Sequence, residues 1–117
     1  MKKDAQKQTV ADVRWQGRAA VVAVKGEIDL SCSSEFQNSL LDLLKDKPES
    51  IVVDLSSVPH MDSSGIASLV KLLGRSRKVS VPVRLAGLQK RVQSLFEITR
   101  LDRVFEIYPG VKEALAT

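Results

Sequence analysis

Residues 51–73 read IVVDLSSVPHMDSSGIASLVKLL, which places a short polar segment between an apolar β-branched run and a leucine-rich run. The run Ile51–Leu55 has the length and β-branching of a buried strand. The leucine-rich run has apolar residues at helical spacing, namely Ile66, Leu69, Val70 and Leu73. A buried strand therefore leads into an amphipathic helix through the polar segment at residues 59–66.

The polar segment provides good residues for starting a helix. Asp62, Ser63 and Ser64 are all favoured at the N-cap, and we expect the helix to span Ser64–Lys78 with Ser63 as its cap or the residue before it. The first turn of a helix has unpaired N–H groups and the positive end of the dipole, so it favours negative charge. Two interpretations follow: an ordinary cap, or a serine whose hydroxyl is free to take a phosphate.

A second signature lies upstream, where Val24-Lys25-Gly26-Glu27-Ile28-Asp29 connects another strand to another helix. The two signatures, in this order and at this spacing, resemble those of the STAS domain. The likeness is specifically to the bacterial anti-sigma factor antagonists, and it covers nearly the whole chain. The resemblance implies that Ser63, the first serine after the aspartate, is a phosphoacceptor.

The resemblance also implies a mechanism of partner switching. The unphosphorylated chain would bind an anti-sigma factor with a histidine-kinase-like ATPase fold, which frees a sigma factor. That serine kinase would phosphorylate Ser63 and release the chain, and a PP2C-type phosphatase would reverse the modification. Asp29 and Asp62 would align the serine with the kinase's nucleotide, and the partner surface would also include Ser64, Gly65 and Ile66.

Other outputs are compatible with the same resemblance. STAS domains also serve as non-switching subunits of lipid-transport ATPase complexes, in which the Ser63 region would only make contact. The chain could equally regulate a secretion or motility pathway without a sigma factor. Under each of these readings the chain is a binding or regulatory protein and not an enzyme.

Gly65 falls in the first turn of the predicted helix. Glycine is about 1 kcal/mol less favourable than alanine inside a helix, so its presence needs a reason. Backbone strain at the junction is one candidate, and close approach by a partner is the other. We expect close approach, because the polar side chains can close the junction without a positive φ.

The rest of the chain alternates strand and helix patterns. A hairpin with Gly17 in its turn joins strands at Val10–Trp15 and Ala19–Lys25. The later expected elements are a helix capped by Ser31, Ser33 or Ser34 and ending before Pro48, the strand and helix described above, a strand at Val83–Ala86, a helix around Val92–Phe96, a strand at Val104–Tyr108 and a helix at Val111–Leu115. This order predicts an α/β fold: a β-hairpin leading into βαβαβα repeats, with a mixed, mostly parallel sheet of four to five strands and helices mainly on one face.

Length and composition indicate one domain. The chain has 117 residues and 44% hydrophobic residues, enough for a single aliphatic core, which we assign to residues 9–117 after a flexible tail at residues 1–8. The longest apolar run, Ala19–Val24, is far shorter than the roughly 20 residues that span a bilayer. The charged N-terminus is followed by no apolar region typical of a signal peptide. We therefore expect a cytoplasmic protein without membrane insertion, monomeric when free.

Several other chemistries lack their required residues. Residues 71–117 carry ten basic against four acidic side chains, but no aromatic residues alternate with the basic ones as nucleic-acid binding would favour. The single histidine, His60, and the single cysteine, Cys32, cannot form a common zinc site, and Cys32 is expected to be a packing residue. Asp54, His60 and Ser63 have the residue types of a hydrolase triad, but they are crowded into ten residues and the serine lacks the Gly-x-Ser-x-Gly elbow. No glycine-rich loop that binds the phosphates of a nucleotide occurs either. No metal or cofactor is expected.

Overall fold

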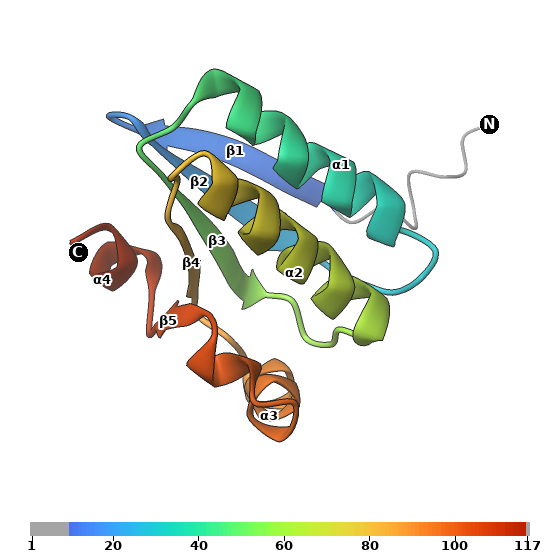
Figure 1. Ribbon diagram of the computed structural model, residues 1–117. Helices are drawn as coiled ribbons and strands as arrows, with labels where there is room; N and C mark the ends of the chain where they lie inside the picture. Colours follow the sequence, from blue (N-terminus) through green and yellow to red (C-terminus); the bar gives the residue numbers. More distant parts are fainter. Residues whose placement is uncertain (1–9, 117) are drawn as a thin grey trace.

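Strand β3 (Ser50–Ser57) lies at the centre of a five-stranded sheet in the computed structural model, which describes residues 10–116 (Figure 1). The strands lie in the order β1-β2-β3-β4-β5, the same as their order along the chain. The other elements are β1 (Val10–Gln16), β2 (Ala19–Lys25), α1 (Ser33–Leu43), η2 (Leu44–Asp46), α2 (Ser63–Lys78), β4 (Val83–Ala86), α3 (Lys90–Ile98), η3 (Leu101–Arg103), β5 (Glu106–Tyr108) and α4 (Val111–Leu115). The expected tail at residues 1–8 lies outside the described residues.

The pairing of the strands confirms the predicted mixed sheet. β1 and β2 pair antiparallel, with Val13 opposite Val22 and Trp15 opposite Ala20. Gly17 closes the hairpin between them with a φ of +62°, a left-handed conformation that favours glycine. The pairs β2–β3, β3–β4 and β4–β5 are all parallel. Parallel neighbours require crossover connections, and the helices supply them.

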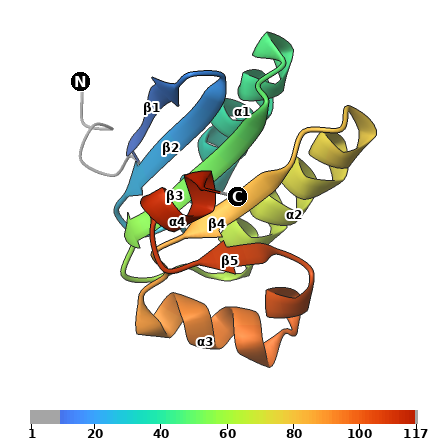
Figure 2. The same cartoon turned by 90° about the vertical axis from the view of Figure 1, so that its left-hand side faces the viewer.

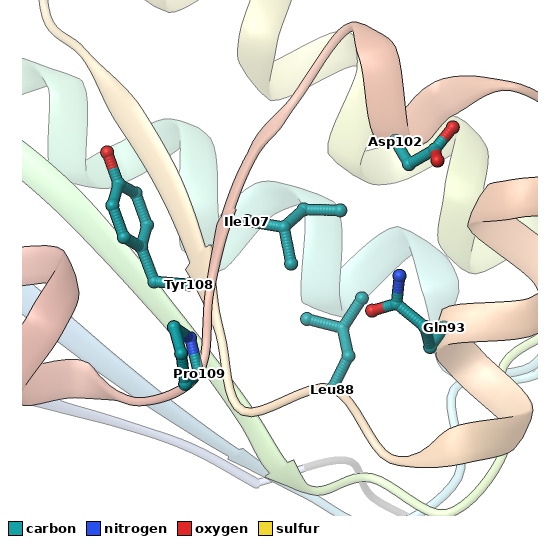
Figure 3. A pocket seen from close by; sticks show the side chains of 6 residues that line it. All are labelled: Leu88, Gln93, Asp102, Ile107, Tyr108 and Pro109. Carbon is teal, nitrogen blue, oxygen red and sulfur yellow. The ribbon is translucent and has the colours of Figure 1, made fainter.

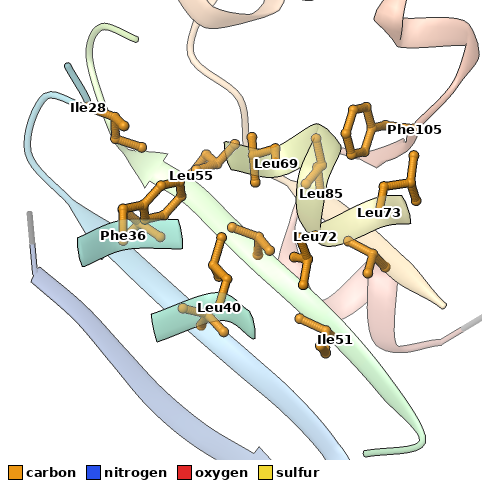
Figure 4. Packing of buried hydrophobic residues seen from close by; sticks show 14 of the residues in the cluster. Ile28, Phe36, Leu40, Ile51, Leu55, Leu69, Leu72, Leu73, Leu85 and Phe105 are labelled. Carbon is orange, nitrogen blue, oxygen red and sulfur yellow. The ribbon is translucent and has the colours of Figure 1, made fainter. Parts of the chain in front are cut away.

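The helices lie mainly on one face of the sheet, as the sequence predicts. Ile51, Val53 and Leu55 of β3 are fully buried in a core shared with α1, α2 and α3 (Figure 4). Alternate strand residues point to the opposite face, where Val52 belongs to a second, smaller cluster covered by α4 (Figure 2). The two clusters explain why residues 51–53 of the central strand are all apolar, on both faces of the sheet.

Several predicted boundaries differ from the structure. β1 ends at Gln16 and β3 spans Ser50–Ser57, so both strands are longer than expected, and three further differences concern the starts of two helices and of β5. Helix α2 begins at Ser63, one residue earlier than expected, because Asp62 takes the N-cap position. Helix α1 begins at Ser33 after Cys32, and no serine caps it. Strand β5 is confined to Glu106–Tyr108, because the preceding Phe105 turns into the core and packs edge-on against Phe96, with ring centroids 5.6 Å apart.

Candidate functional site

The loops that follow β2 and β3 are joined to each other by backbone hydrogen bonds. The N–H of Ile28 donates to the carbonyl of His60 over 3.1 Å, and the N–H of Asp62 donates to the carbonyl of Ile28 over 3.1 Å. These bonds form a parallel bridge between Ile28 and Met61 just beyond the sheet. The two sequence signatures, which are distant along the chain, therefore lie side by side at the carboxyl edge of neighbouring parallel strands.

Asp62 organises the second of these loops. Its Oδ1 accepts hydrogen bonds from the backbone N–H of Ser64 at 2.9 Å, from that of Gly65 at 3.4 Å and from the Ser64 hydroxyl at 2.5 Å. The prediction that Ser63 is the cap of α2 or the residue before the cap is wrong. The Asp62 carboxylate caps the helix, and Ser63 is its first residue. The Ser63 side chain is exposed, whereas Ser64 is half-buried and held by Asp62.

Asp29 organises the first loop in the same way. Its Oδ1 accepts hydrogen bonds from the N–H of Ser31 at 3.0 Å and from the Ser31 hydroxyl at 2.6 Å. This pairing explains why Ser31 does not cap α1. Cys32, the next residue, is buried in the core as the packing residue that the sequence predicts.

Both aspartates are held in the ionised form. Hydrogen bonds from Ser31, chiefly through its hydroxyl, lower the pKa of the Asp29 carboxyl, while the nearby charge of Asp62 acts weakly in the opposite direction. The Ser64 hydroxyl is the main cause that lowers the pKa of Asp62, and backbone hydrogen bonds, including one from Leu30, add to it. At neutral pH the bridged loops therefore carry two interacting negative charges, one of them on Asp62, the residue directly before the exposed Ser63.

Gly65 is buried behind this surface, which changes the explanation for it. A Cβ added at this position would lie 2.5 Å from Met61 Cγ and 2.8 Å from Ile28 Cγ2. Its φ is not among the positive values of the chain, so backbone strain does not explain it either. The glycine lets the bridged loops pack tightly against α2, and close approach by a partner is not needed to account for it. Ile66, the next residue, is partly buried against the core.

A separate pocket of about 470 Å³ lies beside β5 (Figure 3). It is lined by Leu88, Gln93, Asp102, Ile107, Tyr108 and Pro109. The figure shows Tyr108 on the other side of the strand from Ile107, and the Tyr108 hydroxyl donates to Glu106 Oε1 over 2.9 Å. None of the lining residues is among the predicted site residues, so the pocket is distinct from the bridged loops.

The order of strands, the bridged loops and the capped helix together define a STAS-type domain. The chain matches the STAS domain family over residues 10–114. It belongs to this family, as the sequence signatures predict.

Within the family, the chain is similar to anti-sigma factor antagonists. It is 28% identical over 110 residues to the anti-sigma-F factor antagonist RsfB of Mycobacterium tuberculosis, covering 92% of this chain and 84% of that protein. It is 30% identical over 91 residues to the anti-sigma-B factor antagonist of Staphylococcus aureus, covering 78% of this chain and 84% of that protein.

Solved structures give the same picture of the fold. The crystal structure of an anti-sigma factor antagonist from Mycobacterium paratuberculosis superimposes with a TM-score of 0.85 at 25% identity, covering 92% of this chain and 91% of that one. The phosphorylated form of the Bacillus cell fate determinant SpoIIAA has a TM-score of 0.72 at 16% identity, covering 92% of this chain and 97% of that one. At that level of identity the second likeness concerns the fold alone.

The structure brings the predicted site residues into one region but divides them by exposure. Asp29, Asp62 and the two serines lie at its surface, fully or partly exposed, whereas Gly65 lies beneath them. Leu30, between Asp29 and Ser31, is 78% exposed and was not among the predicted site residues. It occupies the middle position of an Asp-x-Ser pattern that recurs at residues 62–64. Among residues 10–116, no cluster of His, Cys, Asp or Glu could hold a metal ion, and no helix is long and apolar enough to cross a membrane.

Replacing Gly65 by alanine should destabilise the domain. The added methyl group overlaps Met61 and Ile28, so we expect the free energy of unfolding to fall by about 1 to 3 kcal/mol in urea titrations. Gly74, on the same helix, has no atom within 4 Å of its virtual Cβ and serves as the control. Gly74→Ala should raise stability by about 0.5 to 1 kcal/mol. Equal stability of the two variants would contradict this account.

Asp62 should make stability depend on pH at the acidic end. Because its pKa is lower in the folded chain than in the unfolded chain, its contribution is complete above the unfolded pKa of about 3.9 and is lost as the pH falls through the folded pKa. Asp62→Asn keeps a capping oxygen but cannot titrate. The stability difference between wild type and Asp62→Asn should therefore shrink as the pH is lowered from about 6 to about 2, as measured by urea unfolding. A difference that grows toward low pH would exclude this role.

Proposed function

We propose that this chain is an anti-sigma factor antagonist that acts by partner switching. In its unphosphorylated form it binds an anti-sigma factor with a histidine-kinase-like ATPase fold and thereby frees a sigma factor. The anti-sigma factor phosphorylates Ser63, the complex dissociates, and a PP2C-type phosphatase restores the binding form. In this scheme the chain is a kinase substrate without catalytic activity of its own, and it is monomeric when free.

The observation that carries the proposal is the different state of the two serines in the same turn. The Ser64 hydroxyl is held by Asp62 at 2.5 Å, and its side chain is half-buried. Ser63 is the first residue of α2 and is exposed, so a kinase can reach it. The helix N-terminus also favours a negatively charged group at this position. The named functions of the relatives support an anti-sigma factor as the partner.

The charges at the site support the direction of the switch. A phosphoserine adds about 1.5 to 2 negative charges at neutral pH. It would join the carboxylates of Asp29 and Asp62, whose pKa values are both lowered by hydrogen bonds. An interface that accommodates the neutral hydroxyl would then have to bury a strongly negative cluster, which opposes binding unless the partner supplies cations. The free phosphorylated chain keeps the charge in water, so its fold is retained.

Ser63 should be the principal phosphoacceptor. Incubation with the anti-sigma factor kinase encoded in the same genome and ATP should add one phosphate to the wild type and none to Ser63→Ala, as measured by intact-protein mass spectrometry. Ser64→Ala is the matched control, because it changes the neighbouring hydroxyl and leaves Ser63 exposed. We expect it to be phosphorylated. A Ser63→Ala protein that still gained a full phosphate would reject the assignment.

A negative charge at Ser63 should separate binding from folding. We expect Ser63→Asp to bind the same anti-sigma factor at least about tenfold more weakly, while its free energy of unfolding stays within about 1 kcal/mol of wild type. Ser63→Asn, which has the same shape without the charge, should bind more tightly than Ser63→Asp. Titration calorimetry and thermal melts provide the two measurements. Wild-type affinity in Ser63→Asp would count against the switch.

A further inference from the structure

The two bridged loops have the same local construction. In each one an aspartate accepts both the N–H and the hydroxyl of the serine two residues later: Asp29 with Ser31, and Asp62 with Ser64. The parallel bridge joins Ile28 to Met61, the residues directly before the two aspartates. The loops therefore run in step, so that the middle residue of the first, Leu30, corresponds to the middle residue of the second, Ser63.

The side chains of the two middle residues take no part in the hydrogen bonds that close the turns, and both residues are exposed. The Leu30 side chain is 78% exposed. Leu30 lies two residues after Ile28, whose backbone is hydrogen-bonded to His60 and Asp62, so Leu30 is held beside the loop that presents Ser63. Apolar side chains with this much exposure are uncommon in the chain: of the large hydrophobic residues between residues 12 and 116, only Ile98, at 79%, is comparably exposed.

We propose that Leu30 is the apolar anchor of the surface that binds the anti-sigma factor. The side chain enters an apolar pocket on that partner, next to the position where the partner meets the Ser63 hydroxyl. Leu30 makes no packing contribution that would account for a leucine here, because most of its surface faces water in the free chain. Burial of a leucine between two proteins removes apolar surface from water and gives the binding surface affinity that does not depend on charge.

The proposal rests on the proposed function and adds a division of roles within it. Ser63 provides the part of the interface that phosphorylation reverses. Leu30 provides a constant part, which contributes to affinity whatever the charge at Ser63. The first turn is closed by hydrogen bonds from the backbone and the side chain of Ser31 to Asp29. A change of side chain at Leu30 therefore leaves the hydrogen bonds of the turn in place.

The test measures binding of the chain to the purified anti-sigma factor kinase from the same genome. Leu30→Ala should bind at least about tenfold more weakly than wild type by titration calorimetry. Leu30→Met, which nearly conserves volume, should bind within about threefold of wild type. Ile98→Ala is the matched control, since Ile98 is as exposed but lies at the end of α3, outside both loops; its affinity should be unchanged. Thermal melts of all three variants should match the wild type.

The outcomes separate this inference from the function on which it rests. If Ser63→Asp weakens binding and Leu30→Ala does not, the switch stands and the anchor is rejected. If Leu30→Ala weakens binding and Ser63→Asp does not, the anchor stands and the phosphorylation switch is rejected. Equal losses of affinity in Leu30→Ala and Ile98→Ala would show a general effect of apolar surface and overturn the assignment of Leu30. A wild-type chain that does not bind the anti-sigma factor would overturn both the assignment and the proposed function.

Discussion

The bridge between Ile28 and Met61 is the constraint on which the site depends. Two backbone hydrogen bonds of 3.1 Å fix the register of loops that belong to different crossover units. The sheet alone brings the ends of β2 and β3 to the same edge, but it does not determine how the loops beyond that edge are aligned. The bridge places one aspartate beside the other and aligns the exposed positions that follow them. Its tight packing in turn requires a residue without a side chain at position 65.

The region combines a buried layer that holds the fold with an exposed outer layer that we propose for recognition. Ile28, Met61 and Gly65 are buried and hold the loops to α2. Asp29 and Asp62 lie between the two layers, because their carboxylates close the turns and also set the local charge. Ser63 and Leu30 form the outer layer, where neither side chain is required by the fold. Under the proposed switch, this arrangement lets phosphorylation of Ser63 change binding while the domain remains folded.

Much of this architecture was predictable because it follows from local patterns. The β-branched run at Ile51–Leu55 and the helical spacing after it defined the central strand and α2, and the order of elements gave the mixed sheet. The family signatures pointed to Ser63 and both aspartates as site residues, and the structure places these residues in one region. The cap position was missed because three good cap residues, Asp62, Ser63 and Ser64, stand in succession, and only geometry decides among them. The explanation predicted for Gly65 was wrong because the side chains that a Cβ would meet, those of Met61 and Ile28, are brought together by a bridge between loops distant in sequence, which leaves no local pattern.

The two turns are closed by hydrogen bonds between residues only two positions apart. Their middle positions are therefore free to vary in evolution without loss of the domain's stability. A cell that keeps several such proteins needs each one to bind its own partner and not the others, and discrimination of this kind is a difference between affinities. With the roles proposed for Leu30 and Ser63, position 30 is a place where that difference can be introduced without altering Ser63, so that parallel pathways share one switch chemistry and still remain insulated from each other.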